Sequence, residues 1–205
     1  IAALLKQQDL SGLRSSGVSG GTRGERQLGG KWIAPGVGPR RVDEVLVAPG
    51  AQSALAAIVT TLTQPGDVIV TDRIAYPGIR TIAAQFGLIL AGVDSDAEGM
   101  MPEQFDRVCA QHHPRVLYCI PTIHNPTTAT MSLQRRRDIL AVAQLHHLHV
   151  VEDDPYSLLM DTPPPALAAL DHGRVFYVAT LAKTLSPGLR TAYVALPGTD
   201  MTRRV

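Results

Sequence analysis

The sequence has little cysteine, few aromatic residues and almost no net charge, and each shortage excludes a class of protein. Two cysteines, Cys109 and Cys119, are too few for a disulfide framework. We therefore expect two core thiols and a reducing, cytoplasmic environment. The formal net charge of +1 favours neither a polyanionic partner nor an acidic membrane surface. No apolar run reaches the roughly 18 residues that a membrane-spanning helix needs.

What the chain does have is enough apolar material for one sizeable domain. It holds 205 residues, of which 45% are hydrophobic. It begins at Ile1 and ends in "DMTRRV", where we expect a new helix to start. We therefore expect residues 1–205 to form a single large domain that belongs to a longer polypeptide.

Short runs rich in β-formers alternate with helical patterns along most of the chain. The runs are continuously apolar, which is typical of parallel strands covered on both faces. Strands are predicted at 44–48, 67–71, 88–93, 115–120, 149–153, 174–180 and 191–196, and helices at 51–63, 77–86, 102–112 and 132–146. The pattern predicts a three-layer, doubly wound α/β domain with a mainly parallel, seven-stranded sheet. The glycine-rich first 40 residues are expected to be mostly loop.

Five polar or Gly/Pro-rich segments follow predicted strands. They are "PGAQSAL", "DRIAYPG", "PTIHNPTT", "EDDPY" and "LAKTLSPGLR". Ligands of open α/β sheets bind at the carboxyl ends of the strands, where such segments converge. This edge of the sheet is therefore the predicted site.

Each of these segments also has a plain structural interpretation. Lys183 can be a solvated charge, Asp153 can cap a turn, and Asn125 before Pro126 is a turn signal. Tyr76 can be a packed aromatic side chain. Separate structural explanations would require five independent coincidences, one for each segment. A single site shared by the five segments is therefore the favoured interpretation.

Two further clusters are expected to be structural. His146, His147 and His149 suggest a metal at first, but neighbouring side chains on a helix diverge, so no metal site is predicted. The run 135–137 holds three arginines. We expect them on the exposed face of a helix, with no role in binding nucleic acid.

The five segments, from about Trp32 to Pro197, resemble the fold-type I pyridoxal-phosphate aminotransferases of class I/II. The resemblance is strongest to the α-aminoadipate and kynurenine type and to the aminotransferase-like domains of MocR-type GntR regulators. It implies the large domain of the aspartate-aminotransferase-like fold, with pyridoxal 5'-phosphate as cofactor.

The resemblance assigns the catalytic roles and those around the cofactor ring. Lys183 would form the Schiff base and then serve as general base. Asp153 would pair with the pyridinium nitrogen, which lets the ring act as an electron sink. Asn125 and Tyr156 would bind the 3'-oxygen, and Tyr76 would stack on the ring.

The same resemblance predicts a cradle for the phosphate. Arg190 would clamp it bidentately, and Thr180 would add a hydroxyl. The amides of Ala51 and Gln52 would bind it at a helix N-terminus.

Some positions depart from the family pattern. Ala51 and Ala182 replace residues that are often hydroxylated, so the phosphate cup has fewer hydroxyls. A tyrosine that reaches the partner subunit's phosphate would fall near Ser16 and is missing. "NPTT" stands where the enzymes commonly have "NPTG", and it is closer to the regulators.

Two functions remain open. One is an aminotransferase that moves an amino group between an amino acid and a 2-oxo acid. The other is the effector domain of a MocR-type regulator, which would bind DNA through a separate N-terminal domain before Ile1. The family also implies a homodimer and a substrate-binding arginine in a small domain beyond Val205.

Overall fold

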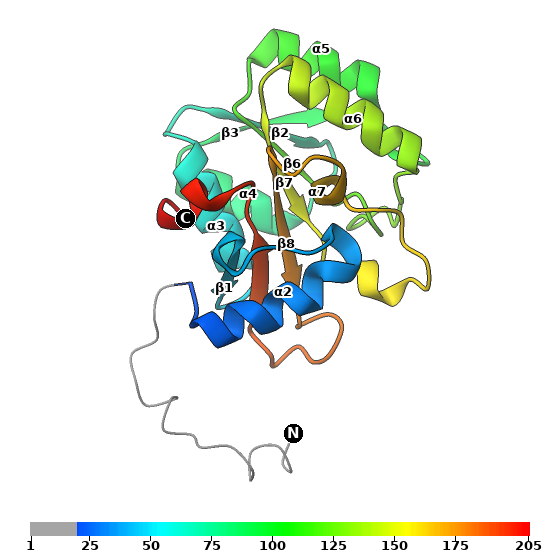
Figure 1. The fold of residues 1–205 in the computed structure, drawn as a ribbon. Helices are drawn as coiled ribbons and strands as arrows, with labels where there is room; N and C mark the ends of the chain where they lie inside the picture. The colour runs from blue at the N-terminus through cyan, green and yellow to red at the C-terminus, as the bar shows by residue number, and fades with distance from the viewer. Residues whose placement is uncertain (1–19) are drawn as a thin grey trace.

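The computed structural model describes residues 20–205, so Ser16 lies outside the described residues. A seven-stranded sheet runs through the centre of the molecule, with helices on both faces (Figure 1). Its strands are β1 (Val45–Ala48), β2 (Val68–Asp72), β3 (Ile89–Val93), β6 (Val116–Cys119), β7 (His149–Asp153), β8 (Val175–Thr180) and β9 (Ala192–Ala195).

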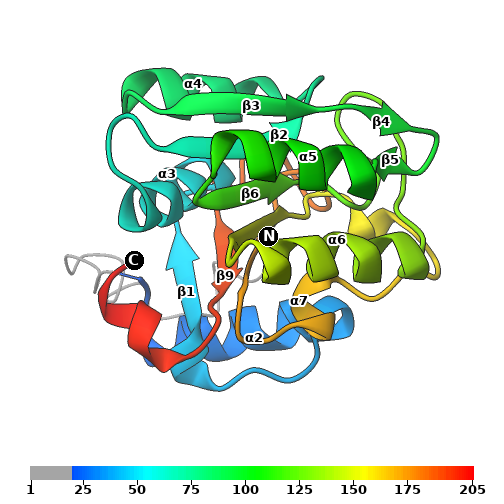
Figure 2. The same ribbon diagram turned by 90° about the horizontal axis from the view of Figure 1, so that it is seen from above.

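The strands follow the order β1-β9-β8-β7-β6-β2-β3. β9 is antiparallel to both of its neighbours, and every other pair in this sheet is parallel. The sheet twists across its width, so that β1 and β3 run in clearly different directions in Figure 2. A small hairpin of β4 (Ser95–Asp96) and β5 (Gly99–Met100) lies outside it. The predicted mainly parallel, seven-stranded sheet is confirmed.

The helices form the two outer layers of a three-layer domain. They are α2 (Arg23–Val37), α3 (Ala51–Leu62), α4 (Pro77–Gln85), α5 (Pro102–His112), α6 (Leu133–Leu145) and α7 (Leu167–Leu170), with short 3-10 turns η2 (Val42–Glu44), η3 (Ser157–Leu159) and η4 (Thr199–Arg203). One apolar core joins α3 and α4 to one face of the sheet. A second core joins α2, α5, α6 and α7 to the other face.

Helix α2 corrects the expectation of a loop-rich start for residues 20–40, the part of this segment that the structure describes. Thr22 caps the helix, because its hydroxyl accepts the Glu25 amide while the Glu25 carboxylate accepts the Thr22 amide at 2.7 Å. Gly29 packs so closely on Tyr193 that a Cβ there would collide with the ring. The glycines that suggested a loop therefore permit close packing of a helix on the sheet.

Arg136 corrects the expectation of an exposed arginine face, because its side chain is fully buried. Its guanidinium donates to the carbonyl oxygens of Met131 at 3.1 Å and Pro121 at 3.0 Å. It also lies 3.6 Å from Glu152 Oε1. A buried cation requires such partners. Here they come from the loop just before α6 and from β7.

Cys109 and Cys119 are both free and buried, as predicted, and burial raises the pKa of the Cys109 thiol to about 12. Between residues 20 and 205, no helix is long and apolar enough to cross a membrane.

Replacement of Arg136 by methionine is predicted to destabilise the fold by about 3–5 kcal/mol. The change leaves the buried Glu152 carboxylate without its cationic partner. Urea unfolding measures the loss. The matched control is Arg137→Met, at an exposed neighbour on the same helix, which should change the free energy of unfolding by less than about 0.5 kcal/mol. Equal effects of the two changes would contradict the buried ion pair.

Candidate active site

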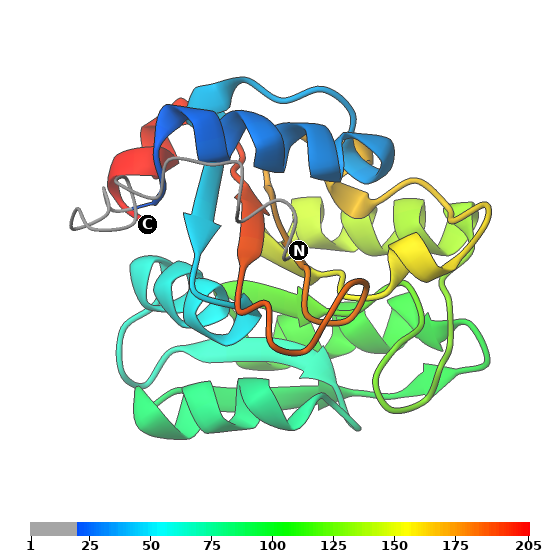
Figure 3. The same cartoon turned by 90° about the horizontal axis from the view of Figure 1, so that it is seen from below.

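The five polar segments lie along one edge of the sheet. β1, β2, β6, β7 and β8 run in the same direction, so their carboxyl ends meet at this edge. The loop after β8, coloured orange in Figure 3, lies beside the start of α3. The arrangement that the sequence predicts for these segments is therefore the one observed.

Asp153 ends β7 and has one carboxylate oxygen without a partner. The side chain is only 4% exposed, and its Oδ2 accepts a hydrogen bond from the Tyr118 hydroxyl at 2.8 Å. Its Oδ1 is buried and accepts no hydrogen bond from any described residue. Burial raises the pKa of Asp153 to about 7, although the Tyr118 bond acts in the opposite direction. A buried, unpaired acceptor is costly, and this one is suited to a cationic donor.

Tyr76 shares an electrostatic environment with three other predicted site residues. It lies at the start of α4 and is half-buried. Burial raises the pKa of its hydroxyl, and the charges of Asp153 and Tyr156 raise it further. Arg190 acts in the opposite direction. The structure therefore brings Tyr76, Asp153, Tyr156 and Arg190 into one neighbourhood.

An anion cradle forms where α3 begins. The first amides of a helix have no partner within it and carry a partial positive charge. Gly50 precedes this end with φ of 99°, and a Cβ there would lie 3.2 Å from Arg190 Nη2. Glycine thus lets the guanidinium approach the amides of Ala51 and Gln52. A cation beside a helix N-terminus is suited to a phosphate.

The Gln52 side chain ties this cradle to the start of α4. Its Nε2 donates to the Gly78 carbonyl oxygen at 3.0 Å, and a Cβ at Gly78 would collide with both Gln52 and Tyr76. The side chain of Gln52 is therefore used inside the protein, which leaves its backbone amide for a ligand.

The segment with the candidate lysine forms the loop between β8 and β9. Lys183 is exposed in this loop. The buried Thr180 hydroxyl donates to the Thr191 carbonyl oxygen and accepts the Ala182 amide, both at 3.2 Å. The Thr180 hydroxyl thus closes the base of the lysine loop, which is a structural use that the sequence did not suggest.

Asn125 is half-buried in a loop that buried polar groups hold in place. His124 Nδ1 lies 2.8 Å from the Thr127 hydroxyl, and its Nε2 lies 3.5 Å from Asp72 Oδ2. Burial raises the pKa of Asp72, and the His124 charge acts in the opposite direction. Arg136 binds the carbonyl oxygens at both ends of the loop.

The nine predicted residues therefore all lie at one edge of the sheet, but hydrogen bonds do not connect all of them. Within residues 20–205, no hydrogen bond joins Asn125 or Lys183 to the other predicted residues. Sequence reasoning missed Tyr118 and the Asp72–His124 pair. Tyr118 left one usable signal, since a tyrosine in a continuously buried strand needs a partner for its hydroxyl.

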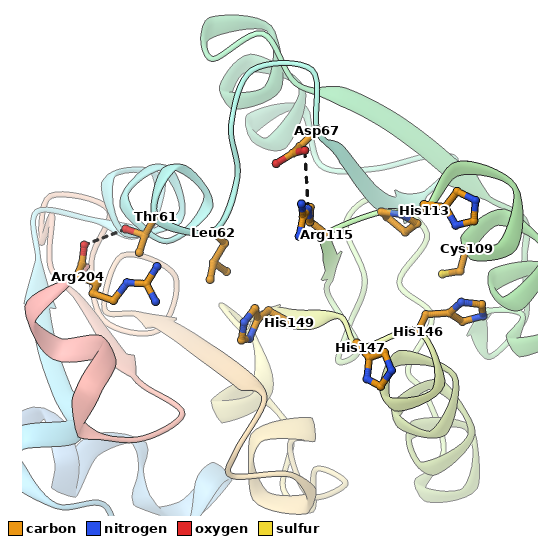
Figure 4. Close-up of a pocket in the computed structure, with 11 residues that line it drawn as sticks. Thr61, Leu62, Asp67, Cys109, His113, Arg115, His146, His147, His149 and Arg204 are labelled. Carbon is orange, nitrogen blue, oxygen red and sulfur yellow. Dashed lines mark hydrogen bonds and ion pairs between the residues drawn. The ribbon is translucent and has the colours of Figure 1, made fainter.

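A separate cavity of about 610 Å³ opens at the opposite, amino-terminal edge of the sheet (Figure 4). It is lined in part by His113, Arg115, His146, His147, His149 and Arg204. The histidine rings are spread around its wall instead of converging on one point. In the described part of the chain, no group of three or more histidine, cysteine or acidic side chains is placed to hold a metal ion.

The sequence model of the family "Aminotransferase class I and II" matches residues 27–201. The chain belongs to this family. It is 37% identical over 194 residues to the uncharacterized HTH-type transcriptional regulator YdeF of Bacillus subtilis. This alignment covers 95% of the chain and 42% of YdeF. It is 35% identical over 160 residues to aminotransferase swnA of Metarhizium robertsii, covering 71% of the chain and 32% of that protein.

Among solved structures, the α-aminoadipate aminotransferase LysN of Thermus thermophilus is similar with a TM-score of 0.88 and 27% identity. The match covers 99% of this chain and 52% of LysN. The chain thus spans less than half the length of the curated relatives named above and about half of LysN.

Asp153→Asn is predicted to stabilise the cofactor-free protein, and more so as the pH rises. The carboxyl ionises near 3.8 in the unfolded chain and at about 7 in the folded one, so the stability of wild type falls as pH rises through this window. The neutral amide removes this term and still accepts from Tyr118. Urea unfolding should show the advantage of the variant growing by about 2–3 kcal/mol between pH 5 and pH 8.

The control for this measurement is Asp161→Asn, at an exposed position in the segment after η3. It should be indistinguishable from wild type at both pH values. If the free energy of unfolding of Asp153→Asn differed from that of wild type by the same amount at pH 5 and pH 8, the carboxyl would not be held in a protonated, buried state.

Proposed function

We propose that the chain is the cofactor-binding domain of a pyridoxal-phosphate-dependent aminotransferase, which moves an amino group between an amino acid and a 2-oxo acid. The observation that carries the proposal is the buried Asp153 Oδ1, which lacks a donor. It shares an edge with the Arg190 cradle, so that one site offers an acceptor for a cationic ring nitrogen and donors for a phosphate.

The residues present fit pyridoxal phosphate. Asp153 would accept a hydrogen bond from the protonated ring nitrogen. Arg190 and the first amides of α3, from Ala51 and Gln52, would bind the phosphate. Tyr76 would cover one face of the ring. The missing hydroxyls at Ala51 and Ala182 leave the phosphate dependent on the guanidinium and the helix end.

When bound, the cofactor supplies an electron sink for charge that develops at the substrate α-carbon. Lys183 would hold it covalently through Nζ and, once a substrate amine takes that place, would carry a proton on the same nitrogen. Asn125 and Tyr156 would donate hydrogen bonds to the ring oxygen. Thr180 would support the lysine loop through its bond to the Thr191 carbonyl.

Similar proteins support this assignment. LysN was solved complexed with N-(5'-phosphopyridoxyl)-L-leucine, a conjugate of an amino acid with the same cofactor. Other curated relatives carry the name kynurenine/α-aminoadipate aminotransferase. Amino acids and 2-oxo acids are therefore the proposed substrates. We propose that the residues that determine substrate specificity lie outside residues 1–205.

A second candidate is the effector domain of a transcription regulator. Three relatives from Bacillus subtilis are named HTH-type transcriptional regulators and share 35–37% identity with the chain. In this proposal the cofactor site serves as a sensor, and DNA is bound by a part of the protein outside this chain. For either function we propose a homodimer in a reducing, cytoplasmic compartment.

The lysine assignment is tested by trapping the cofactor on the full-length protein. Borohydride reduction after incubation with pyridoxal phosphate should add a phosphopyridoxyl group to the peptide that carries Lys183, as mass spectrometry would detect. The yellow absorbance of the unreduced protein should disappear in Lys183→Ala. It should persist in Lys31→Ala, which changes an exposed lysine on α2.

The same preparation separates the two functions. Loss of the yellow band with release of a 2-oxo acid, on addition of one amino acid from a panel, indicates the aminotransferase. A shifted band without any released 2-oxo acid indicates the regulator. A wild-type protein that stays colourless and unmodified contradicts both.

A further inference from the structure

We propose that Tyr118 is a positioning residue for the cofactor, because its hydroxyl fixes Asp153 with one oxygen held by the protein and the other turned toward the ring nitrogen. The inference rests on the proposed function, since it assigns a task within that same site.

The strand pairing brings the two side chains together. Tyr118 lies opposite Val151 in the parallel register of β6 and β7. Asp153 is two residues further along β7, so its side chain lies on the same face of the sheet. The Tyr118 ring is 1% exposed and packs in the core beneath α3. A side chain so confined holds its hydroxyl in one place, 2.8 Å from Asp153 Oδ2.

The contact also has an electrostatic effect. Burial raises the pKa of Asp153, and the adjacent Asp154 raises it further. Tyr76 and Cys119 are the other titratable groups whose interaction with Asp153 is resolved in the described residues. The Tyr118 hydrogen bond is the contribution that lowers the pKa, because it stabilises the carboxylate. A charged carboxylate holds a protonated ring nitrogen more strongly than a neutral carboxyl does.

The neighbouring strand contains a matched pair with a different task. Tyr177 in β8 is 2% exposed and donates to Asp154 Oδ2 at 2.8 Å. Asp154 Oδ1 accepts the Ser157 amide at 3.0 Å, so both of its oxygens have partners. Tyr177 packs in the core on the other face of the sheet. The two tyrosines make equal hydrogen bonds, but only the one from Tyr118 leaves an acceptor free.

Tyr118→Phe removes the hydroxyl and keeps the ring that fills the core. The pKa of Asp153 in the cofactor-free protein should rise, because the hydrogen bond that stabilises its carboxylate is lost. The affinity for pyridoxal phosphate at neutral pH should fall by about tenfold, since a buried hydrogen bond to a charged group is lost. Tyr177→Phe should change neither quantity.

The first readout needs no cofactor. In full-length protein labelled with 13C at the aspartate carboxyl carbons, the signal absent from Asp153→Asn identifies Asp153. Its pH titration is then compared in wild type, Tyr118→Phe and Tyr177→Phe. The second readout is the dissociation constant for pyridoxal phosphate of the same three proteins, with urea unfolding to establish that each is folded.

The outcomes separate the inference from the proposed function. A Tyr118→Phe protein that titrates and binds like wild type overturns the role of Tyr118 and leaves the proposed function standing. Equal weakening in both tyrosine variants overturns it too, because general packing damage then explains the loss. Failure of wild type to bind pyridoxal phosphate overturns the proposed function and with it this inference. A shifted titration with weaker binding in Tyr118→Phe alone supports it.

Discussion

The burial of three consecutive carboxylates at the end of β7 is the constraint on which this structure depends. Glu152, Asp153 and Asp154 are each at most 4% exposed. Side chains of a strand alternate between its two faces, so the layers on both faces must supply partners. Glu152 receives Arg136 and two backbone amides from α7, while Asp154 receives Tyr177 and the Ser157 amide. The partners for Asp153 are incomplete.

This asymmetry links stability to function. The fully satisfied Glu152 and Asp154 fasten α6, α7 and the turn after β7 to the sheet, and Arg136 also binds both ends of the loop that carries Asn125. Asp153 keeps one buried oxygen free, which costs stability in the absence of a ligand. A cationic ligand that meets this oxygen regains that cost as binding energy. Such local conflict is expected at functional sites.

The sequence predicted the sheet well, because continuously apolar runs separated by turn residues fit buried parallel strands better than any other element. It failed where partners come from distant segments. Gly29 suggested a loop because glycine is common in loops. Its role in packing against Tyr193 depends on a residue far away in the sequence and could not be predicted locally. Arg136 resembles its exposed neighbour Arg137 in sequence, and its burial is explained by Glu152 together with the carbonyl oxygens of Met131 and Pro121. The candidate site residues come from the family resemblance and stay predictions, whereas the contact of Tyr118 with Asp153 follows from the register of β6 and β7.

The most direct measurement is a crystal structure of the full-length protein grown with pyridoxal phosphate. We expect continuous density from Lys183 Nζ to the cofactor, with the ring nitrogen roughly 2.7–2.9 Å from Asp153 Oδ1. We also expect the Tyr118 hydroxyl to stay on Oδ2. A cofactor bound elsewhere, or a ring nitrogen that faces any group other than Asp153, would show that the buried Asp153 oxygen is not the acceptor for the cofactor.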